Sequence, residues 1–216
     1  MDGKCWIRCP WHGWDFDPLT GKPPGGHEDS GQELYPLKVE NGEIFVGLEP
    51  EPEHERTVTD VMAETMVNWG VKRIFGMVGH SNLGLADAIR LQVNKGKLGY
   101  VGIRHEGAAA FAASAYGKLT GKPAGCLTIA GPGATNLVTG LWDAKVDRAP
   151  VLALTGQVQT QVFGPGAFQD IDLKSAFEAV ARFSQPVLTS SNHAELMTLA
   201  LKTAIVEQDV SHLIFP

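Results

Sequence analysis

A carboxylate stands at the point where a strand is predicted to give way to a helix. Glu106 follows the apolar stretch 100–103 and precedes the alanine-rich stretch 107–119, whose small residues let a flat ligand or another backbone come close. A side chain at this place could pass a proton to and from a ligand. It could equally be a residue of the first helical turn, where the helix macrodipole favours negative charge. Taken alone, its type and position leave both interpretations open.

Two further groups of residues follow predicted strands. One is Gly131–Pro132–Gly133–Ala134–Thr135–Asn136, and the other is Gly166–Ala167–Phe168–Gln169–Asp170. The first group lacks the last glycine of the dinucleotide-binding pattern, because Asn136 stands in its place, and Pro132 has no amide to offer a phosphate. We therefore reject a dinucleotide loop. The group is either a ligand loop of another kind or a plain turn from strand to helix.

A cysteine and a histidine near the start of the chain could bind a metal ion. They lie in Cys9–Pro10–Trp11–His12–Gly13–Trp14, where a thiolate and an imidazole three positions apart can reach one metal from a single loop. One alternative is a zinc site whose ligand types suit tetrahedral coordination but whose spacing matches no familiar pattern; its ligands would be Cys5, Cys9, His12 and His27. The other alternative is that these are core residues without a ligand.

The elements that must position these residues fall into two parts of the chain, which differ in composition and pattern. Residues 1–48 are rich in Gly, Pro and aromatic residues, and Asn41–Gly42 between two strand-like runs predicts a hairpin turn. Residues 49–56 hold two prolines and four glutamates and predict a linker. Residues 57–216 alternate between helix and strand patterns. This predicts an α/β fold, a doubly wound and mainly parallel sheet with helices on both faces, preceded by a small all-β part.

The expected elements of the larger part follow from its apolar periodicity and its turn residues. Helices are predicted at 58–69, from about 82, at 107–119, at 134–145 and at 192–206, and strands at 72–77, 100–103, 124–130 and 151–155. In the smaller part, strands are predicted at 34–39 and 43–48.

The composition argues against several classes of function. Lys and Arg number 18 against 24 Asp and Glu, the formal net charge is −6, and no basic run is present. Nucleic acid is therefore not an expected partner. No apolar run reaches membrane-spanning length, so no membrane association is expected. The three cysteines, an odd number without a visible secretion signal, argue against a disulfide framework, and the expected location is the cytoplasm.

The cysteine-histidine string closely resembles the second ligand loop of a Rieske [2Fe–2S] domain. The resemblance extends over Phe16–Asp17, Thr20–Gly21 and Tyr35–Pro36–Leu37. In that family each of two loops supplies one Cys and one His to the cluster, which implies that Cys9 and His12 are metal ligands. The other loop, Cys-x-His, is expected upstream. Only eight residues precede Cys9 and they contain no Cys-x-His, so half of the ligands are expected to be missing.

The larger part, 57–216, is similar to the N-terminal pyrimidine-binding domain of thiamine-diphosphate enzymes of the pyruvate oxidase and acetolactate synthase family. The resemblance rests on RHEGAAAFAA at 104–113, GPGATN at 131–136 and AFQD at 167–170, in this order. It implies that Glu106 hydrogen-bonds N1′ of the cofactor's aminopyrimidine and so activates the cofactor. The residues that it implies for cofactor binding are Gly79, Glu106, Pro132, Asn136 and Gln169. His80 is a less secure neighbour of the site, and His105 is expected to be packed rather than catalytic.

The same resemblance implies an enzyme larger than this chain. Relatives hold the diphosphate and Mg²⁺ in a C-terminal domain with a Gly-Asp-Gly motif, which is not present here, and FAD in a middle domain. We therefore expect a fragment of a longer fusion, inactive alone, that acts on a 2-oxo acid as a homo-oligomer or with a diphosphate-binding domain or subunit. FAD in the full-length protein and [2Fe–2S] in a complete Rieske domain are further expectations. The alternative is an inactive or separate-subunit binding module.

Overall fold

The computed structural model describes residues 5–8, 15–24, 32, 34–47 and 54–216. The chain forms two compact units, Met1–Glu55 and Arg56–Pro216, and each is described by itself. The division predicted from sequence, with residues 49–56 as a linker, stays a prediction. In the described ranges no helix is long and apolar enough to cross a membrane.

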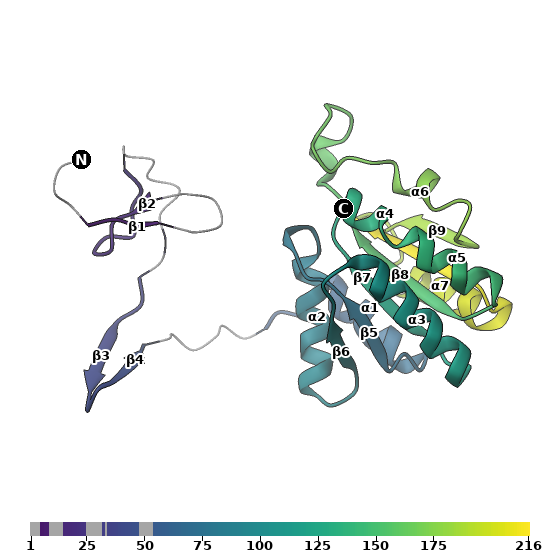
Figure 1. Cartoon of the computed structure of the whole chain (residues 1–216), viewed down its shortest axis with the longest axis horizontal. Helices are drawn as coiled ribbons and strands as arrows, with labels where there is room; N and C mark the ends of the chain where they lie inside the picture. Colours follow the sequence, from purple (N-terminus) through teal and green to yellow (C-terminus); the bar gives the residue numbers. More distant parts are fainter. Residues whose placement is uncertain (1–4, 9–14, 25–31, 33, 48–53) are drawn as a thin grey trace. The chain divides into compact units, whose positions relative to one another are not determined.

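The smaller unit contains two short antiparallel pairs of strands (Figure 1). Strand β1 (Ile7–Arg8) pairs with β2 (Asp15–Phe16), and β3 (Leu37–Glu40) pairs with β4 (Glu43–Val46). Asn41 and Gly42 both have positive φ, +52° and +82°, as the predicted two-residue hairpin turn requires. Strand β3 begins at Leu37, later than predicted. Pro36 has no amide for a ladder hydrogen bond and comes directly before the strand.

The larger unit is built on one six-stranded, wholly parallel sheet, which confirms the predicted α/β class. Its strands stand in the order β6-β5-β7-β8-β10-β9. Their bounds are β5 Arg73–Gly76, β6 Gly99–Gly102, β7 Ala124–Thr128, β8 Val151–Gly156, β9 Phe183–Pro186 and β10 Val210–Phe215.

Helices cover both faces of this sheet and create two cores (Figure 1). On one face lie α1 (Val58–Asn68), α2 (Leu83–Asn94) and α7 (His193–Glu207), and on the other lie α3 (Glu106–Thr120), α4 (Pro132–Thr135), α5 (Val138–Val146) and α6 (Leu173–Ala176). Successive strand side chains alternate between the two cores. Cys126 packs under α3 and α5, whereas Leu127 packs under the helices of the opposite face.

The ends of several helices follow from local chemistry. Thr57 and Asp60 form a reciprocal capping box at the start of α1, and Gly70 with φ +90° follows the end of that helix. Asn192 accepts a hydrogen bond from the amide of Glu195 at the start of α7, as its spacing predicts. The single helix predicted over 134–145 is instead two helices. The helix is interrupted at Asn136 and Leu137, between the end of α4 and the start of α5.

The strand order reverses direction beside β5. The sequence proceeds from β5 to β6 on one side and then to β7 on the other side of β5. The segment after β5, with the short 3₁₀ helix His80–Asn82, leads into α2 on one face. The segment after β7 leads into α4 and α5 on the opposite face. Open α/β sheets bind ligands at the carboxyl ends of strands at such a reversal.

Candidate functional site

The predicted carboxylate occupies the first position of α3. Its predecessor, His105, has extended backbone and caps the helix, because its Nδ1 accepts a hydrogen bond from the amide of Gly107 (3.1 Å). His105 was expected to be packed, but its side chain is exposed, because a ring that caps the helix stands outside the first turn. Glu106 itself is half-buried. The helix start is therefore fixed by its cap, and the carboxylate projects from a defined place.

Asn136 comes from the next segment of the fold and meets this carboxylate. Its side-chain Nδ2 donates a hydrogen bond to Oε2 of Glu106 over 3.0 Å. The backbones are close as well. A β-carbon built on Gly107 would lie 3.3 Å from the carbonyl oxygen of Asn136. The absence of a side chain at Gly107 thus lets the start of α3 rest against the end of α4.

Two glycines face Ile129, which lies between the loop after β5 and the loop after β7. A β-carbon on Gly79 would lie 2.5 Å from Cγ2 of Ile129, and one on Gly133 would lie 2.6 Å from its Cγ1. Neither loop could carry a larger residue at these positions without moving. The same built β-carbon on Gly133 would lie 3.3 Å from Oε1 of Glu106. The loop after β7 therefore leaves its bare backbone beside the carboxylate.

Gln169 supports the loop after β7 from the other side. Gly131 has φ +64° and ψ −128°, and a β-carbon there would lie 2.8 Å from Cα of Gln169. This conformation and this contact both require glycine. Nε2 of Gln169 donates a long hydrogen bond, 3.4 Å, to the carbonyl oxygen of Ala130, whose amide donates to Oγ of Ser81 (2.9 Å).

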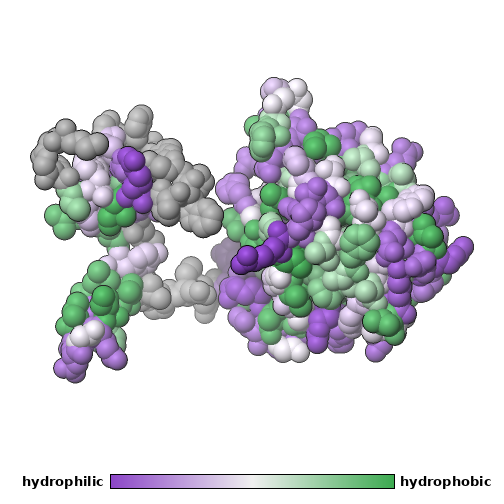
Figure 2. All heavy atoms as spheres, viewed as in Figure 1, coloured by the Kyte–Doolittle hydropathy of each residue, from purple (hydrophilic) through white to green (hydrophobic). Residues whose placement is uncertain are grey.

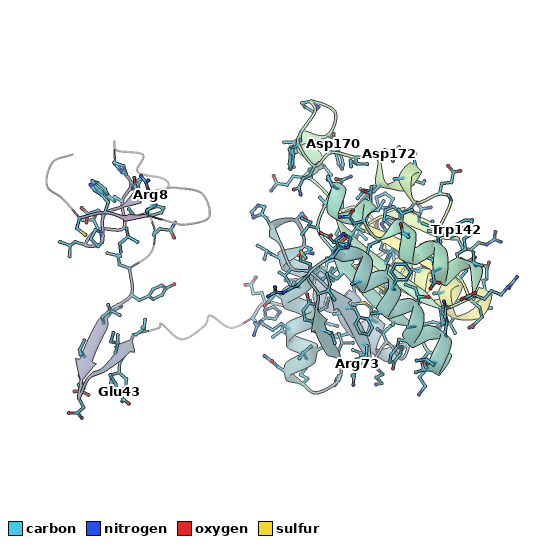
Figure 3. The ribbon with its side chains drawn as sticks, viewed as in Figure 1. Arg8, Glu43, Arg73, Trp142, Asp170 and Asp172 are labelled. Carbon is cyan, nitrogen blue, oxygen red and sulfur yellow. The ribbon has the colours of Figure 1, made fainter. Side chains whose placement is uncertain are left out.

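Asp170, the last residue of the AFQD string, has a different role. It lies on the loop between β8 and α6, where Figure 3 labels it beside Asp172. Its carboxylate accepts a hydrogen bond from the amide of Gly164 (2.8 Å). Asp172 caps α6 by accepting from the amide of Ser175, and it also accepts from the Ser175 hydroxyl (2.6 Å). The hydroxyl and then the amide lower the pKa of Asp172. Both carboxylates order the loop.

The structure brings most of the predicted site residues to one end of the sheet. Glu106 and Asn136 are in direct contact, Gln169 lies under Gly131 next to Pro132, and Gly79 is joined to them through Ile129. His80 lines a neighbouring hollow of about 490 Å³ whose wall also includes Gln157, Gln169 and Phe215. Cys9 and His12 lie outside the described residues.

Two supporting residues were not identified from sequence, nor was the bond between two predicted ones. Ile129 and Ser81 contact the site loops only because strands distant in the chain are neighbours in the sheet. The bond from Asn136 to Glu106 spans 30 residues. An apolar residue at a strand end and a serine after a glycine carry no local signal of such contacts, and only the strand order reveals them.

Comparison with known families identifies the larger unit. Residues 56–176, more than half of the chain, match the family described as thiamine pyrophosphate enzyme, N-terminal TPP binding domain. The chain belongs to this family. The match covers Glu106, the loop after β7 and Gln169, and it ends at the last residue of α6.

Relatives of this thiamine pyrophosphate enzyme domain include synthases and an oxidase. The chain is 41% identical over 156 residues to a thiamine pyrophosphate-containing protein of Bacillus subtilis, YdaP, covering 72% of the chain and 27% of the relative. It is 40% identical over 144 residues to acetolactate synthase of Arthrospira platensis (67% and 25%) and 35% identical over 143 residues to pyruvate oxidase of Lactiplantibacillus plantarum (66% and 23%). The chain therefore spans about a quarter of the length of these relatives.

The residues of the site fit the aminopyrimidine end of thiamine diphosphate. Gly131 and Gly133 let the loop after β7 pack tightly against Gln169 and Ile129, so that this loop passes directly beside the carboxylate. Glu106 provides an acceptor with one oxygen facing that backbone. For the metal that accompanies the diphosphate, the described part of the chain contains no group of three or more His, Cys, Asp or Glu side chains able to hold an ion.

Proposed function

We propose that this chain supplies the aminopyrimidine-binding half of a thiamine-diphosphate-dependent active site that acts on 2-oxo acids, in an enzyme of pyruvate oxidase or acetolactate synthase type. The observation that carries the proposal is the half-buried Glu106 carboxylate at the reversal of strand order, with Oε1 facing the bare backbone of Gly133. Family membership and the named relatives support the cofactor and the reaction class.

In this function the residues of the chain bind one ring and move one proton. When bound, thiamine diphosphate supplies a C2 carbon that attacks a 2-oxo acid once deprotonated, and a thiazolium ring that accepts the electrons released with CO₂. Glu106 holds a proton at Oε1 against the ring nitrogen that faces it. Gly131 and Gly133 let their loop pack against Gln169 and Ile129 beside the carboxylate, and Gln169 bonds to the same loop at Ala130. We assign Mg²⁺ and the diphosphate to a partner domain or subunit.

A partner surface for that arrangement lies on α3 and α5. The two helices pack on each other so closely that a β-carbon on Gly140 would lie 2.6 Å from that of Ala110. Their outer faces carry apolar side chains that are 46% to 87% exposed: Phe111, Leu119, Trp142 and Val146. Trp142 points outward from α5 in Figure 3, and Figure 2 shows apolar surface over both helices. Exposed apolar area of this kind marks an association surface.

The isolated chain is expected to give no turnover of pyruvate with thiamine diphosphate and Mg²⁺, and to self-associate. The charge and the metal of the diphosphate supply most of the anchoring, and their site is assigned to a partner. Turnover should appear when a diphosphate-binding domain of an acetolactate synthase or pyruvate oxidase is added, and CO₂ release measures it. Light scattering measures the association, which Trp142→Glu should reduce. Turnover by the chain alone would contradict the assignment of the diphosphate to a partner.

For the smaller unit we propose half of a Rieske ligand set, at Cys9 and His12. The strands on either side of the Cys9–Trp14 string pair with each other, with Arg8 opposite Asp15. An ion pair joins the same two residues, with Nε of Arg8 2.8 Å from Oδ1 of Asp15. The two described residues that flank the string are thus joined, which is compatible with a ligand loop between them. This assignment rests on the string itself, because the family match begins at residue 56.

With one Cys and one His, the chain is expected to hold no stable [2Fe–2S] cluster. Each iron would keep at most one protein ligand in place of two, and the open positions would release the iron. Reconstitution with iron and sulfide, followed by visible absorption and low-temperature EPR, measures this. The wild type should match Cys9→Ala, which removes the only thiolate of the string. A reduced Rieske signal in the wild type that is absent from Cys9→Ala would refute the expectation.

A further inference from the structure

The two oxygens of the Glu106 carboxylate have different surroundings. Oε2 accepts the hydrogen bond from Nδ2 of Asn136, whereas Oε1 faces the bare backbone of Gly133. Within the part of the chain that the structure describes, Oε1 accepts no hydrogen bond. One oxygen is therefore bonded to the protein, and the other is the oxygen that we assign to the aminopyrimidine.

Asn136 is itself held in place by the turn that precedes it. Its backbone amide donates to the carbonyl oxygen of Pro132 (3.1 Å), and its own carbonyl packs against Gly107 at the start of α3. A carboxylate only accepts hydrogen bonds, so the NH₂ end of the amide must be the end that faces Oε2. The direction of the bond thus follows from chemistry as well as from position.

We propose that Asn136 is a positioning residue that acts on the cofactor only through Glu106. By holding Oε2 it fixes the rotation of the carboxylate, and Oε1 then stays beside Gly133. A glutamate side chain has several rotatable bonds, and a held oxygen removes most of that freedom before the ligand arrives. The inference deepens the proposed function and rests on it, and it differs from a direct contact between Asn136 and the cofactor.

The bond can be tested first without any ligand. In the ¹⁵N-labelled full chain, Glu106→Ala should shift the side-chain amide resonances of Asn136 and bring the two amide protons closer in chemical shift. Thr135→Ala is the matched control, since Thr135 lies on the same turn and its hydroxyl donates to the carbonyl of Pro132. That variant should leave the Asn136 amide resonances in place. If the Asn136 amide resonances do not shift in Glu106→Ala, the inference is wrong, independently of any result on cofactor binding.

A double-mutant cycle then separates positioning from direct contact. The probe is 4-amino-5-hydroxymethyl-2-methylpyrimidine, the aminopyrimidine half of thiamine, titrated into the full chain and followed by NMR. Asn136→Ala is expected to weaken its binding roughly tenfold, the size of one lost hydrogen bond to a charged group. In the Glu106→Ala background the same change should have no further effect, because the residue through which Asn136 acts is gone. Asn136→Gln, which keeps a donor, should restore part of the affinity.

Two outcomes count against these ideas separately. Additive losses in the cycle would mean that Asn136 touches the ligand itself, and the positioning inference would be wrong while the proposed function stands. A wild-type chain whose Glu106 and Gly133 resonances ignore the probe at millimolar concentration would contradict the proposed function. The ligand-free response of Asn136 to Glu106→Ala would still decide the positioning inference in that case.

Discussion

Glu106→Gln is expected to slow exchange of the cofactor's C2 proton by about 10²–10⁴-fold without loss of the fold, the range typical of a lost general acid–base group. Glutamine keeps the shape of the side chain, and its amide oxygen can still accept the hydrogen bond from Asn136. It cannot hold and return a proton at Oε1. The reaction should therefore lose its proton relay while α3 still begins at the same residue.

The measurement needs the enzyme assembled from this chain and a diphosphate-binding domain. Exchange of the C2 proton for deuterium is followed by acid quench and NMR, and the melting temperature is recorded on the same sample. Gln169→Ala is the matched control. It keeps the Cβ that contacts Gly131 and loses only a long hydrogen bond, so it should leave proton exchange unchanged and affect later, substrate-dependent steps. If the exchange rate of Glu106→Gln stays within about twofold of the wild-type rate, Glu106 has no part in the proton transfer and only occupies the first turn of α3.

The sequence predicts the elements around Glu106 well, because their signals are local. The alanine-rich run after Glu106 is α3, and the apolar run before Gly131 is β7, within one or two residues at each end. After β7 ends at Thr128, Gly131 and Pro132 start a helical turn, as their backbone preferences dictate. The alternation of strand and helix was enough to predict the parallel sheet.

Contacts between distant segments could not be predicted in this way. Strand order decides that Ile129 lies between Gly79 and Gly133, and nothing in the residues themselves shows it. The break after α4 was missed because 134–145 is apolar enough to continue as one helix, and Asn136 and Leu137 at the break keep helical backbone angles. The resemblance to the family points to both Asn136 and Glu106, but it does not reveal that they bond to each other.

The last two strands were missed for a different reason. Strand β9 contains polar residues and Pro186, which sheets tolerate at an edge, where β9 stands. Strand β10 is buried throughout, yet Ser211 and His212 interrupt its apolar run. A histidine in a fully buried strand was not expected. Its side chain is satisfied by partners from the strands on either side.

His212 is the group on which acid stability of the larger unit should depend. Its Nε2 lies 2.8 Å from Oγ1 of Thr155 on β8, its Nδ1 lies 2.9 Å from Oγ of Ser184 on β9, and its ring stacks on Phe177 at 3.9 Å. A neutral imidazole can donate to one hydroxyl and accept from the other. A protonated ring would have two donors and an uncompensated buried charge. Burial accordingly lowers the pKa of His212 from 6.5 to about 3.

The free energy of unfolding should therefore fall as the pH drops below 6.5. In this range His212 is protonated in the unfolded chain and neutral in the folded chain. The free energy of unfolding therefore falls by about 1.4 kcal/mol for each pH unit down to the folded pKa. Between pH 6.5 and 4.5 the loss is about 2–3 kcal/mol, a large part of the stability of an ordinary domain. Asp143, whose pKa the hydrogen bond from Lys118 lowers, and Asp172 contribute mainly below pH 4, outside this window.

Urea unfolding at a series of pH values measures this dependence, and His212→Gln should remove it. Glutamine can still reach Thr155 but does not titrate, so the variant should be less stable at pH 7 and nearly flat between pH 6.5 and 4.5. His193→Gln is the matched control, because His193 lies at the partly exposed start of α7 and should keep the wild-type slope. A wild-type protein equally stable at pH 6.5 and 4.5 would mean that the buried ring accepts its proton without cost. The two hydroxyls and Phe177 would then not enforce the neutral state, contrary to the geometry that joins β8, β10 and β9.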